Sequence, residues 1–310
     1  MLEREEIRRA VQMALAEDIG SGDATTLATV PPDTKVSASV LAREPLVVAG
    51  LQLAEAAFAE LCPDTTIRRV VRDGDRVQKG GALLVLTEAY GRGVLSAERV
   101  ALNFLQRLSG IATLTAQYVE AVAMTKARIL DTRKTTPGWR RLEKYAVTCG
   151  GGANYRFGLF DQILIKDNHL AALAAAPLSG SLPAGREKNE EKSASADTKV
   201  NVIEAAVLAA RAHYPQLKVE VEADTLEQVK QAADAGADII LFDNMTLEQL
   251  RAAVALVNGR AKTEASGGVN LSTVRAIAET GVDFISVGAL THSARAVDIA
   301  LDFGVSPSKQ

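Results

Sequence analysis

The sequence predicts an α/β protein, with a mixed α/β domain at residues 1–113 and an α/β barrel at residues 114–310. In the second region, short β-rich runs alternate with helical patterns, which indicates a parallel sheet. Polar and charged residues stand at most of the strand ends, which favours a barrel over an open doubly wound sheet. The length fits two domains, or one large barrel with an addition.

The first region consists of short elements separated by turns. Helical spacing of apolar residues near the N-terminus ends in a turn-rich loop at 18–26. A strand is expected at 35–42 and a short helix at 54–61. A long helical pattern follows at 96–124, and we expect Ser109-Gly110 to interrupt it.

The second region has the rhythm of repeated strand–helix units. Strands are expected at 128–132, 162–166, 218–222, 239–243, 262–266 and 284–287, and helices at 226–235, 247–257 and 273–280. No G-x-G-x-x-G motif follows a strand and no Walker A loop is present, which weakens the nucleotide-fold alternatives.

One segment of the second region departs from this rhythm. Residues 177–199 are rich in Ser, Pro, Gly and charge, and their basic and acidic residues cancel. Such a composition buries little apolar surface, so we expect a mobile surface insertion. An active-site lid is the alternative. Deleting the segment is expected to leave activity largely intact, whereas a large loss would favour the lid.

Composition excludes several classes of protein. A net charge of −3 argues against general nucleic-acid binding, which usually needs a basic face. Cys62 and Cys149 lack metal-ligand spacing and fit a reduced cytosol better than a disulfide framework. The charged N-terminus has no signal-peptide pattern, and no apolar run approaches the roughly 18 residues of a membrane span. We therefore expect a cytoplasmic protein without membrane or nucleic-acid partners.

Ligand-type residues stand at the carboxyl ends of the expected strands, where α/β barrels bind their ligands. In chain order these are Arg133, Lys134, Lys166, His169, Glu222, Asp243, Ser266, Gly267, Gly268 and Gly288. Glycines directly before a helix leave backbone N–H groups open to an anion. The two late glycine turns therefore predict a phosphate site.

The charged residues indicate a ligand with more negative charge than one phosphate. Arg133 and Arg156 can each bind a carboxylate or phosphate with two hydrogen bonds. Glu222 and Asp243 can hold Mg²⁺ together or accept hydrogen bonds from sugar hydroxyls, and His169 can contact an anion or donate a proton. These residues indicate a barrel enzyme for a phosphorylated sugar, without specifying the reaction.

Long ordered motifs resemble those of quinolinate phosphoribosyltransferases over nearly the whole chain. They are EDIGSGDATT at 17–26, ERVALNFLQRLSGIAT at 98–113, ILDTRKTTPGWRRLEKYAVTCGGGANYRFGLFDQILIKDNHL at 129–170, VEVEAD at 219–224, LFDN at 241–244, EASGGV at 264–269 and DFISVGALTHS at 283–293. The resemblance implies an N-terminal α/β sandwich followed by an incomplete α/β barrel of six to seven strands. It also implies a homodimer whose active sites are shared between subunits.

The resemblance further implies a reaction. Members of this family transfer the phosphoribosyl group of 5-phosphoribosyl 1-pyrophosphate to quinolinate with Mg²⁺. The products are nicotinate mononucleotide, pyrophosphate and CO₂, in a step of NAD biosynthesis.

The resemblance implies roles for the motif residues as well. Quinolinate would contact Arg133, Tyr155, Arg156 and Lys166, with Arg99 contributed by the other subunit. The phosphoribosyl donor and its phosphate would contact Lys134, Lys166, His169, Ser266, Gly267, Gly268 and Gly288. Glu222 and Asp243 would face the ribose and its Mg²⁺, and they would form the catalytic set together with Lys134 and Lys166.

One position departs from the family pattern. The family usually has histidine where this chain has Tyr155. Tyrosine carries no positive charge at pH 7, so the affinity for quinolinate is expected to differ.

Three other functions stay open on the residues alone. The alternatives are a phosphoribosyltransferase for nicotinate or another pyridine acid, a non-catalytic paralogue that binds a phosphorylated ligand, and an unrelated phosphate-binding barrel such as an aldolase or isomerase. In the aldolase case Lys166 would form a Schiff base.

Overall fold

The computed structural model describes residues 2–175 and 201–304, so the insertion expected at 177–199 lies outside the described residues. The chain packs into two units. The first contains residues up to 120 together with 134–154 and 288 onward, and the second contains 121–133 and 155–287. Each unit is discontinuous in sequence. The domain boundary expected at residue 113 stays a prediction.

The first unit contains an antiparallel sheet in the order β12-β1-β5-β3. Its strands are β1 (Lys35–Ala42), β3 (Thr66–Arg69), β5 (Ala82–Tyr90) and β12 (Ile299–Phe303), and a second, two-stranded sheet pairs β2 (Leu46–Val47) with β4 (Arg76–Val77). Strand β12 comes from the end of the described chain and pairs with β1, so that Val40 lies opposite Leu301. The expected strand at 35–42 is confirmed.

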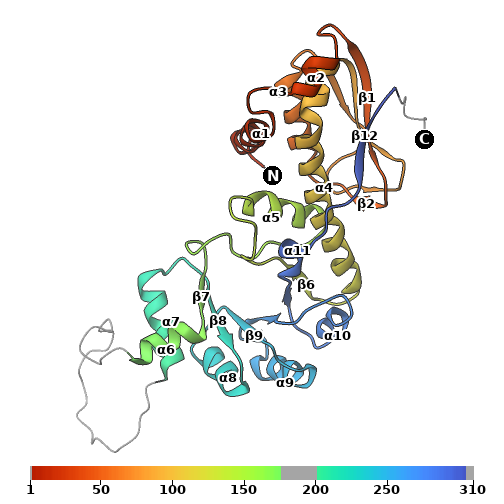
Figure 1. Cartoon of the computed structure of the whole chain (residues 1–310). Helices are drawn as coiled ribbons and strands as arrows, with labels where there is room; N and C mark the ends of the chain where they lie inside the picture. The colour runs from red at the N-terminus through yellow and green to blue at the C-terminus, as the bar shows by residue number, and fades with distance from the viewer. Residues whose placement is uncertain (1, 176–200, 305–310) are drawn as a thin grey trace, which may run out of the picture. The chain divides into compact units, whose positions relative to one another are not determined.

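Helices of the first unit are α1 (Arg4–Ile19), α2 (Ala24–Thr29), α3 (Leu51–Leu61), α4 (Gly91–Ala121), α5 (Arg140–Cys149) and α11 (Ala289–His292). The interruption expected at Ser109-Gly110 is wrong, because α4 is continuous (Figure 1). Both residues serve packing instead. The Ser109 hydroxyl bonds to both backbone groups of Ala49. A Cβ added to Gly110 would lie 2.0 Å from the carbonyl oxygen of Arg295, so only glycine allows this approach.

The second unit is built on a parallel sheet in the order β6-β11-β10-β9-β8-β7. Its strands are β6 (Arg128–Leu130), β7 (Ile163–Ile165), β8 (Val219–Ala223), β9 (Ile239–Asp243), β10 (Lys262–Ser266) and β11 (Phe284–Ser286). The first strand lies beside the last, as in a barrel, while β6 and β7 do not pair in the described part of the chain. The prediction of an incomplete α/β barrel is confirmed.

Helices cover the outer face of this curved sheet (Figure 1). They are α6 (Asp167–Ala175), α7 (Val202–His213), α8 (Leu226–Asp234), α9 (Leu247–Val257) and α10 (Val274–Ala278). Ala223, Phe242, Ala265 and Ile285 share one level of the sheet through strand pairing and are almost fully buried. Successive side chains of a strand point to opposite faces of the sheet. The residues directly before and after each of these four in its strand therefore project to the inner face. None of the described helices is long and apolar enough to cross a membrane.

Candidate active site

Five polar side chains share the inner face of the barrel because of this alternation. Glu220 and Glu222 are two residues apart on β8, Glu264 and Ser266 are two apart on β10, and Asp243 ends β9. Strand pairing places Asp243 beside Ser266, and both Glu222 and Glu264 beside Leu241. Glu222, Asp243 and Ser266 therefore form a rim at the carboxyl ends of the central strands, and Glu220 and Glu264 lie deeper on the same face.

Lys166 and Glu222 form an ion pair at this rim. Lys166 directly follows β7, and its side-chain ammonium donates to the Glu222 carboxylate at 2.5 Å. The lysine side chain is 46% exposed and the glutamate side chain only 11%. The lysine is therefore accessible to a ligand, while the glutamate holds negative charge beneath it.

His169 lies one turn after Lys166, at the start of α6. Its Nδ1 accepts a hydrogen bond from the backbone N–H of Lys166 at 3.0 Å. In this arrangement a neutral ring carries its proton on Nε2, which is left as the donor. The imidazole is exposed, so this donor is available to an anionic ligand.

A strained turn joins Asp243 to the glycines after β10. Asn244 has a left-handed backbone with φ of 53° and donates from its side chain to Asp243 at 2.8 Å. Its backbone N–H donates to the carbonyl of Ser266. Gly267 has φ of +94°, and a Cβ there would lie 2.1 Å from the Asn244 side-chain oxygen. Glycine is required at 267 for both its conformation and its space.

The glycine turn does not lead directly into a helix, which corrects the physical basis predicted for the phosphate site. Residues 269–273 form a loop, in which the Asn270 side chain accepts bonds from the N–H groups of Ser272 and Thr273, and α10 is only five residues long. Anion binding here would depend on backbone N–H groups of Gly267 and Gly268, both with positive φ, rather than on a helix dipole.

Tyr155 and Arg156 are anchored by a hydrogen-bond network within the second unit. The Tyr155 backbone N–H donates to Asp131 at 2.8 Å, and its hydroxyl donates to Glu220 at 2.7 Å. Gln162 donates to the same Glu220 oxygen at 2.7 Å, and its carbonyl accepts from Arg156 at 2.8 Å. The buried Nε of Arg156 has no hydrogen-bond partner among the described residues. A carboxylate bound against this edge of the guanidinium would satisfy the unpaired N–H.

A pair of buried acids, which the sequence interpretation missed, lies below the rim. Glu220 is 0% and Glu264 1% exposed. Burial, together with the neighbouring Glu220 charge, raises the pKa of Glu264 well above its usual value, and burial also raises the pKa of Glu220. Burial and the same Glu220 charge raise the pKa of Tyr155, so its hydroxyl remains a donor. The alternation in VEVE and TEAS could have indicated both acids.

The substitution Glu264→Gln is expected to flatten the pH dependence of stability. A carboxyl group whose pKa is raised on folding stabilises the protein most at low pH, and that stability is lost as pH rises above 4.5 toward the folded pKa. The amide cannot ionise, so the variant should lose less unfolding free energy between about pH 5 and 8. Urea unfolding midpoints across this range, with exposed Glu248→Gln as the control, measure the effect. Parallel profiles for wild type and Glu264→Gln would contradict it.

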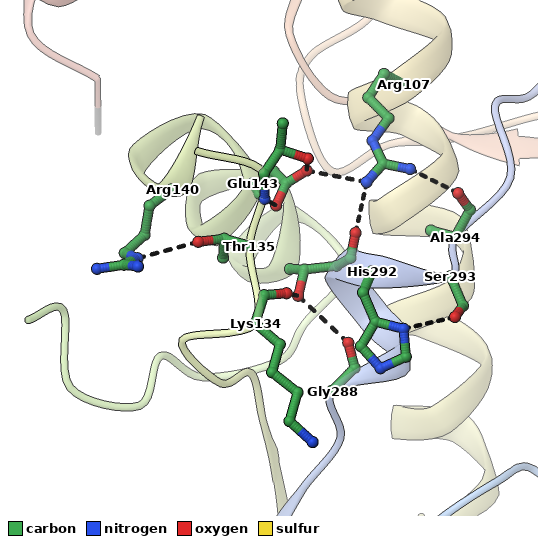
Figure 2. Close-up of polar contacts among 11 residues, drawn as sticks. Arg107, Lys134, Thr135, Arg140, Glu143, Gly288, His292, Ser293 and Ala294 are labelled. Carbon is green, nitrogen blue, oxygen red and sulfur yellow. Dashed lines mark hydrogen bonds and ion pairs between the residues drawn. The ribbon is translucent and has the colours of Figure 1, made fainter. Parts of the chain in front are cut away.

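Lys134 and Gly288 come together in the first unit. A Cβ added to Gly288 would lie 3.1 Å from the Lys134 side-chain carbon Cδ and 3.1 Å from Nε2 of His292. Figure 2 shows the exposed lysine side chain extending past this turn. Arg99 is exposed on α4. The structure thus brings together Lys134 with Gly288, Lys166 with Glu222, and Asp243 with Gly267.

Comparison with known proteins identifies the family. Residues 23–109 match the model of the quinolinate phosphoribosyl transferase N-terminal domain, and residues 111–302 match that of the C-terminal domain. The chain belongs to the quinolinate phosphoribosyltransferase family. The match covers both packing units and every predicted site residue.

Individual members of the family are similar over nearly their full length. The chain is 43% identical to a nicotinate-nucleotide pyrophosphorylase [carboxylating] from Mycobacterium leprae, covering 95% of this chain and 96% of that protein. It is 42% identical to the mitochondrial quinolinate phosphoribosyltransferase [decarboxylating] 2 of Nicotiana glauca, covering 96% and 82%. The solved nicotinate-nucleotide pyrophosphorylase of Francisella tularensis has a TM-score of 0.85 at 35% identity, with 98% of each chain covered.

Proposed function

We propose that this chain transfers the phosphoribosyl group of 5-phosphoribosyl 1-pyrophosphate to quinolinate, releasing pyrophosphate and CO₂ and forming nicotinate mononucleotide for NAD biosynthesis. The observation that carries the proposal is the rim ion pair of Lys166 and Glu222, in a chain that both family models match. Relatives with more than 40% identity are named quinolinate phosphoribosyltransferases [decarboxylating] or nicotinate-nucleotide pyrophosphorylases [carboxylating].

Quinolinate is a dianion, and the basic residues of the chain suit its two carboxylates. Arg156 offers an Nε without a described partner, and Lys166 offers an exposed ammonium. Arg133 adds a second guanidinium that can bind a carboxylate bidentately. The Tyr155 hydroxyl is already bound to Glu220, so we propose that its ring, rather than a charge, lines this subsite. Arg99 would complete the subsite from a partner subunit.

The phosphoribosyl donor needs separate contacts for its 5-phosphate and its pyrophosphate. We assign the 5-phosphate to Ser266 and the backbone N–H groups of Gly267 and Gly268, and the family resemblance implies a contribution from Gly288. Lys134 lies against the Gly288 turn and supplies a positive charge for the pyrophosphate. His169 Nε2 is a further donor for the same anion.

Mg²⁺ is proposed as the cofactor, held by Glu222 and Asp243. Mg²⁺ usually retains several waters and binds one or two carboxylates together with substrate phosphates. Two carboxylates at the ends of adjacent parallel strands fit that requirement. The described residues contain no group of three or more metal-ligating side chains, which fits a site completed by the substrate. When bound, the ion would supply positive charge to the departing pyrophosphate.

The reaction requires positioning and charge neutralisation from these residues. The bond between ribose C1 and pyrophosphate breaks as the quinolinate nitrogen forms its bond to C1, and pyrophosphate leaves with the electron pair. Glu222 and Asp243 stabilise positive charge that develops on the ribose, while Lys134 neutralises the leaving group. The ring nitrogen is then cationic, and its charge stabilises the electron pair that stays on ring carbon C2, the site of protonation, when the 2-carboxylate departs as CO₂. A proton from solvent completes the product.

We also propose a homodimer with shared active sites, since Arg99 is exposed on α4 and the family resemblance implies that it acts across the interface. A cytoplasmic location stays a prediction from composition.

A comparison of quinolinate with nicotinate tests the proposed function. Nicotinate lacks the 2-carboxylate, so it loses at least one charge-assisted contact worth about 3 kcal/mol, or roughly a hundredfold in kcat/KM. We expect nicotinate mononucleotide to form from quinolinate, and far more slowly from nicotinate. Equal or faster turnover of nicotinate would favour a nicotinate phosphoribosyltransferase, and no turnover of either would favour a non-catalytic paralogue.

A further inference from the structure

A buried polar cluster of the first unit lies behind Lys134. Its members are Arg107 on α4, Glu143 on α5 and Thr291 on α11. Figure 2 labels Arg107 and Glu143. The Glu143 side chain is 0% exposed and that of Arg107 is 27% exposed. One guanidinium nitrogen of Arg107 donates to Glu143 at 2.9 Å and to the Thr291 carbonyl at 2.5 Å, and another donates to the Ala294 carbonyl at 2.7 Å. Arg107 therefore ties α4, α5 and α11 together.

The same cluster binds the Lys134 carbonyl and the residue two positions after it. The Thr291 hydroxyl, itself fully buried, donates to the Lys134 carbonyl at 2.7 Å and also reaches the Gly288 carbonyl at 3.3 Å. Two residues after Lys134, the backbone N–H and the hydroxyl of Thr136 donate to the Glu143 carboxylate at 3.1 and 2.9 Å. The segment carrying Lys134 is thus fixed at two points, and one of them is shared with the Gly288 turn.

A contribution to the free energy of unfolding does not by itself account for this buried cluster. Buried ion pairs lose hydration, and replacing one with apolar residues of similar volume is often neutral or stabilising. What such a cluster supplies is a defined backbone position. Lys134 is exposed and its side chain is long, so the position of its backbone decides which region its ammonium can reach.

We infer that Arg107, Glu143 and Thr291 are positioning residues that hold Lys134 against the Gly288 turn and thereby set the affinity for the phosphoribosyl donor. This inference rests on the proposed function, which assigns Lys134 and Gly288 to that substrate. The cluster's hydrogen bonds run to residues 134, 136, 288 and 294. Arg156 and Lys166, proposed for quinolinate, bond instead to Gln162 and Glu222. Arg133, also proposed for quinolinate, directly precedes Lys134 but receives none of these bonds. The effect should therefore fall mainly on the phosphoribosyl donor.

The substitution Thr291→Val tests the inference with a minimal change of shape. It leaves Arg107 and Glu143 in place but removes the hydroxyl that fixes the Lys134 carbonyl. We expect KM for 5-phosphoribosyl 1-pyrophosphate to rise about tenfold, which corresponds to the loss of one buried hydrogen bond. KM for quinolinate should change less than about twofold. Thr291→Ser restores the hydroxyl and should bring the donor KM back toward wild type.

Ser109→Ala is the matched control, because Ser109 is buried on the same helix as Arg107 and its hydroxyl bonds to Ala49. It should lower Tm without changing either KM. If Thr291→Val cannot be purified, Glu143→Gln keeps an acceptor for Thr136 but removes the charge opposite Arg107, and the same selective rise is expected. An unchanged donor KM, or an equal rise in both KM values, would overturn the inference. Failure of wild-type protein to turn over both substrates would instead overturn the proposed function.

Discussion

Replacing Lys166 with methionine is expected to lower kcat/KM for quinolinate by about a thousandfold, or roughly 4 kcal/mol of transition-state stabilisation. Two losses combine. The substrate carboxylate loses a charge-assisted bond worth about 1.5–3 kcal/mol. Glu222, only 11% exposed, loses the ammonium that lies 2.5 Å away and balances its charge. Steady-state kinetics with quinolinate varied at saturating donor measure the effect.

A second lysine of the same unit provides the control for this substitution. Lys230 on α8 also forms an ion pair, with Asp234 at 2.8 Å, but lies on an outer helix. Lys230→Met should leave kcat/KM within about twofold, because exposed pairs of this kind contribute little. A loss below tenfold in Lys166→Met would contradict the role assigned to Lys166. Lys166→Arg should keep part of the activity, whereas a Schiff-base mechanism would lose all of it.

Mixing two inactive variants is expected to restore activity if the sites are shared across a dimer. Arg99→Ala should be inactive alone, since its guanidinium would serve the partner's site, and Lys166→Ala should be inactive for the reasons above. With random subunit exchange, about half of the dimers are mixed and each carries one intact site, so about a quarter of wild-type activity should return.

The control for this experiment combines two defects from the same proposed site. Lys166 and Glu222 bond to each other within one chain, so a mixture of Lys166→Ala with Glu222→Ala should recover nothing. Native mass spectrometry establishes that subunits have exchanged. Exchange without recovery in the first mixture would contradict the sharing of sites and leave Arg99 without the proposed role.

Local signals predicted the barrel well because short β-rich runs alternate with helical patterns along this part of the chain. The predicted strands at 239–243 and 262–266 match β9 and β10, and the predicted helix at 247–257 matches α9. Strand β12 was missed because its partner β1 lies more than 250 residues earlier, and no local pattern encodes such a pairing. Gly110 suggested a break because a glycine required for close packing looks the same in sequence as one in a turn.

The sequence interpretation predicted site residues at the end of each strand separately. It missed the buried residues that hold those strand ends and their side chains in position. Lys166, Glu222 and Asp243 were proposed as site residues because polar residues at strand ends are conspicuous in the sequence, and their roles stay predictions. Glu220 and Glu264 were passed over because a charged residue inside a strand is usually taken to face solvent. The cluster around Lys134 joins three helices through bonds between distant residues, so only the folded chain brings it together.

The most direct measurement follows one labelled carbon through a single reaction. Quinolinate labelled in its 2-carboxylate is incubated with the protein, Mg²⁺ and 5-phosphoribosyl 1-pyrophosphate, and labelled CO₂, pyrophosphate and nicotinate mononucleotide are measured together. We expect the three products in equal amounts, with all released label in CO₂ and none released when the donor is omitted. Pyrophosphate release with the label retained in the pyridine product, or CO₂ release without the donor, would contradict coupled phosphoribosyl transfer and decarboxylation by this chain.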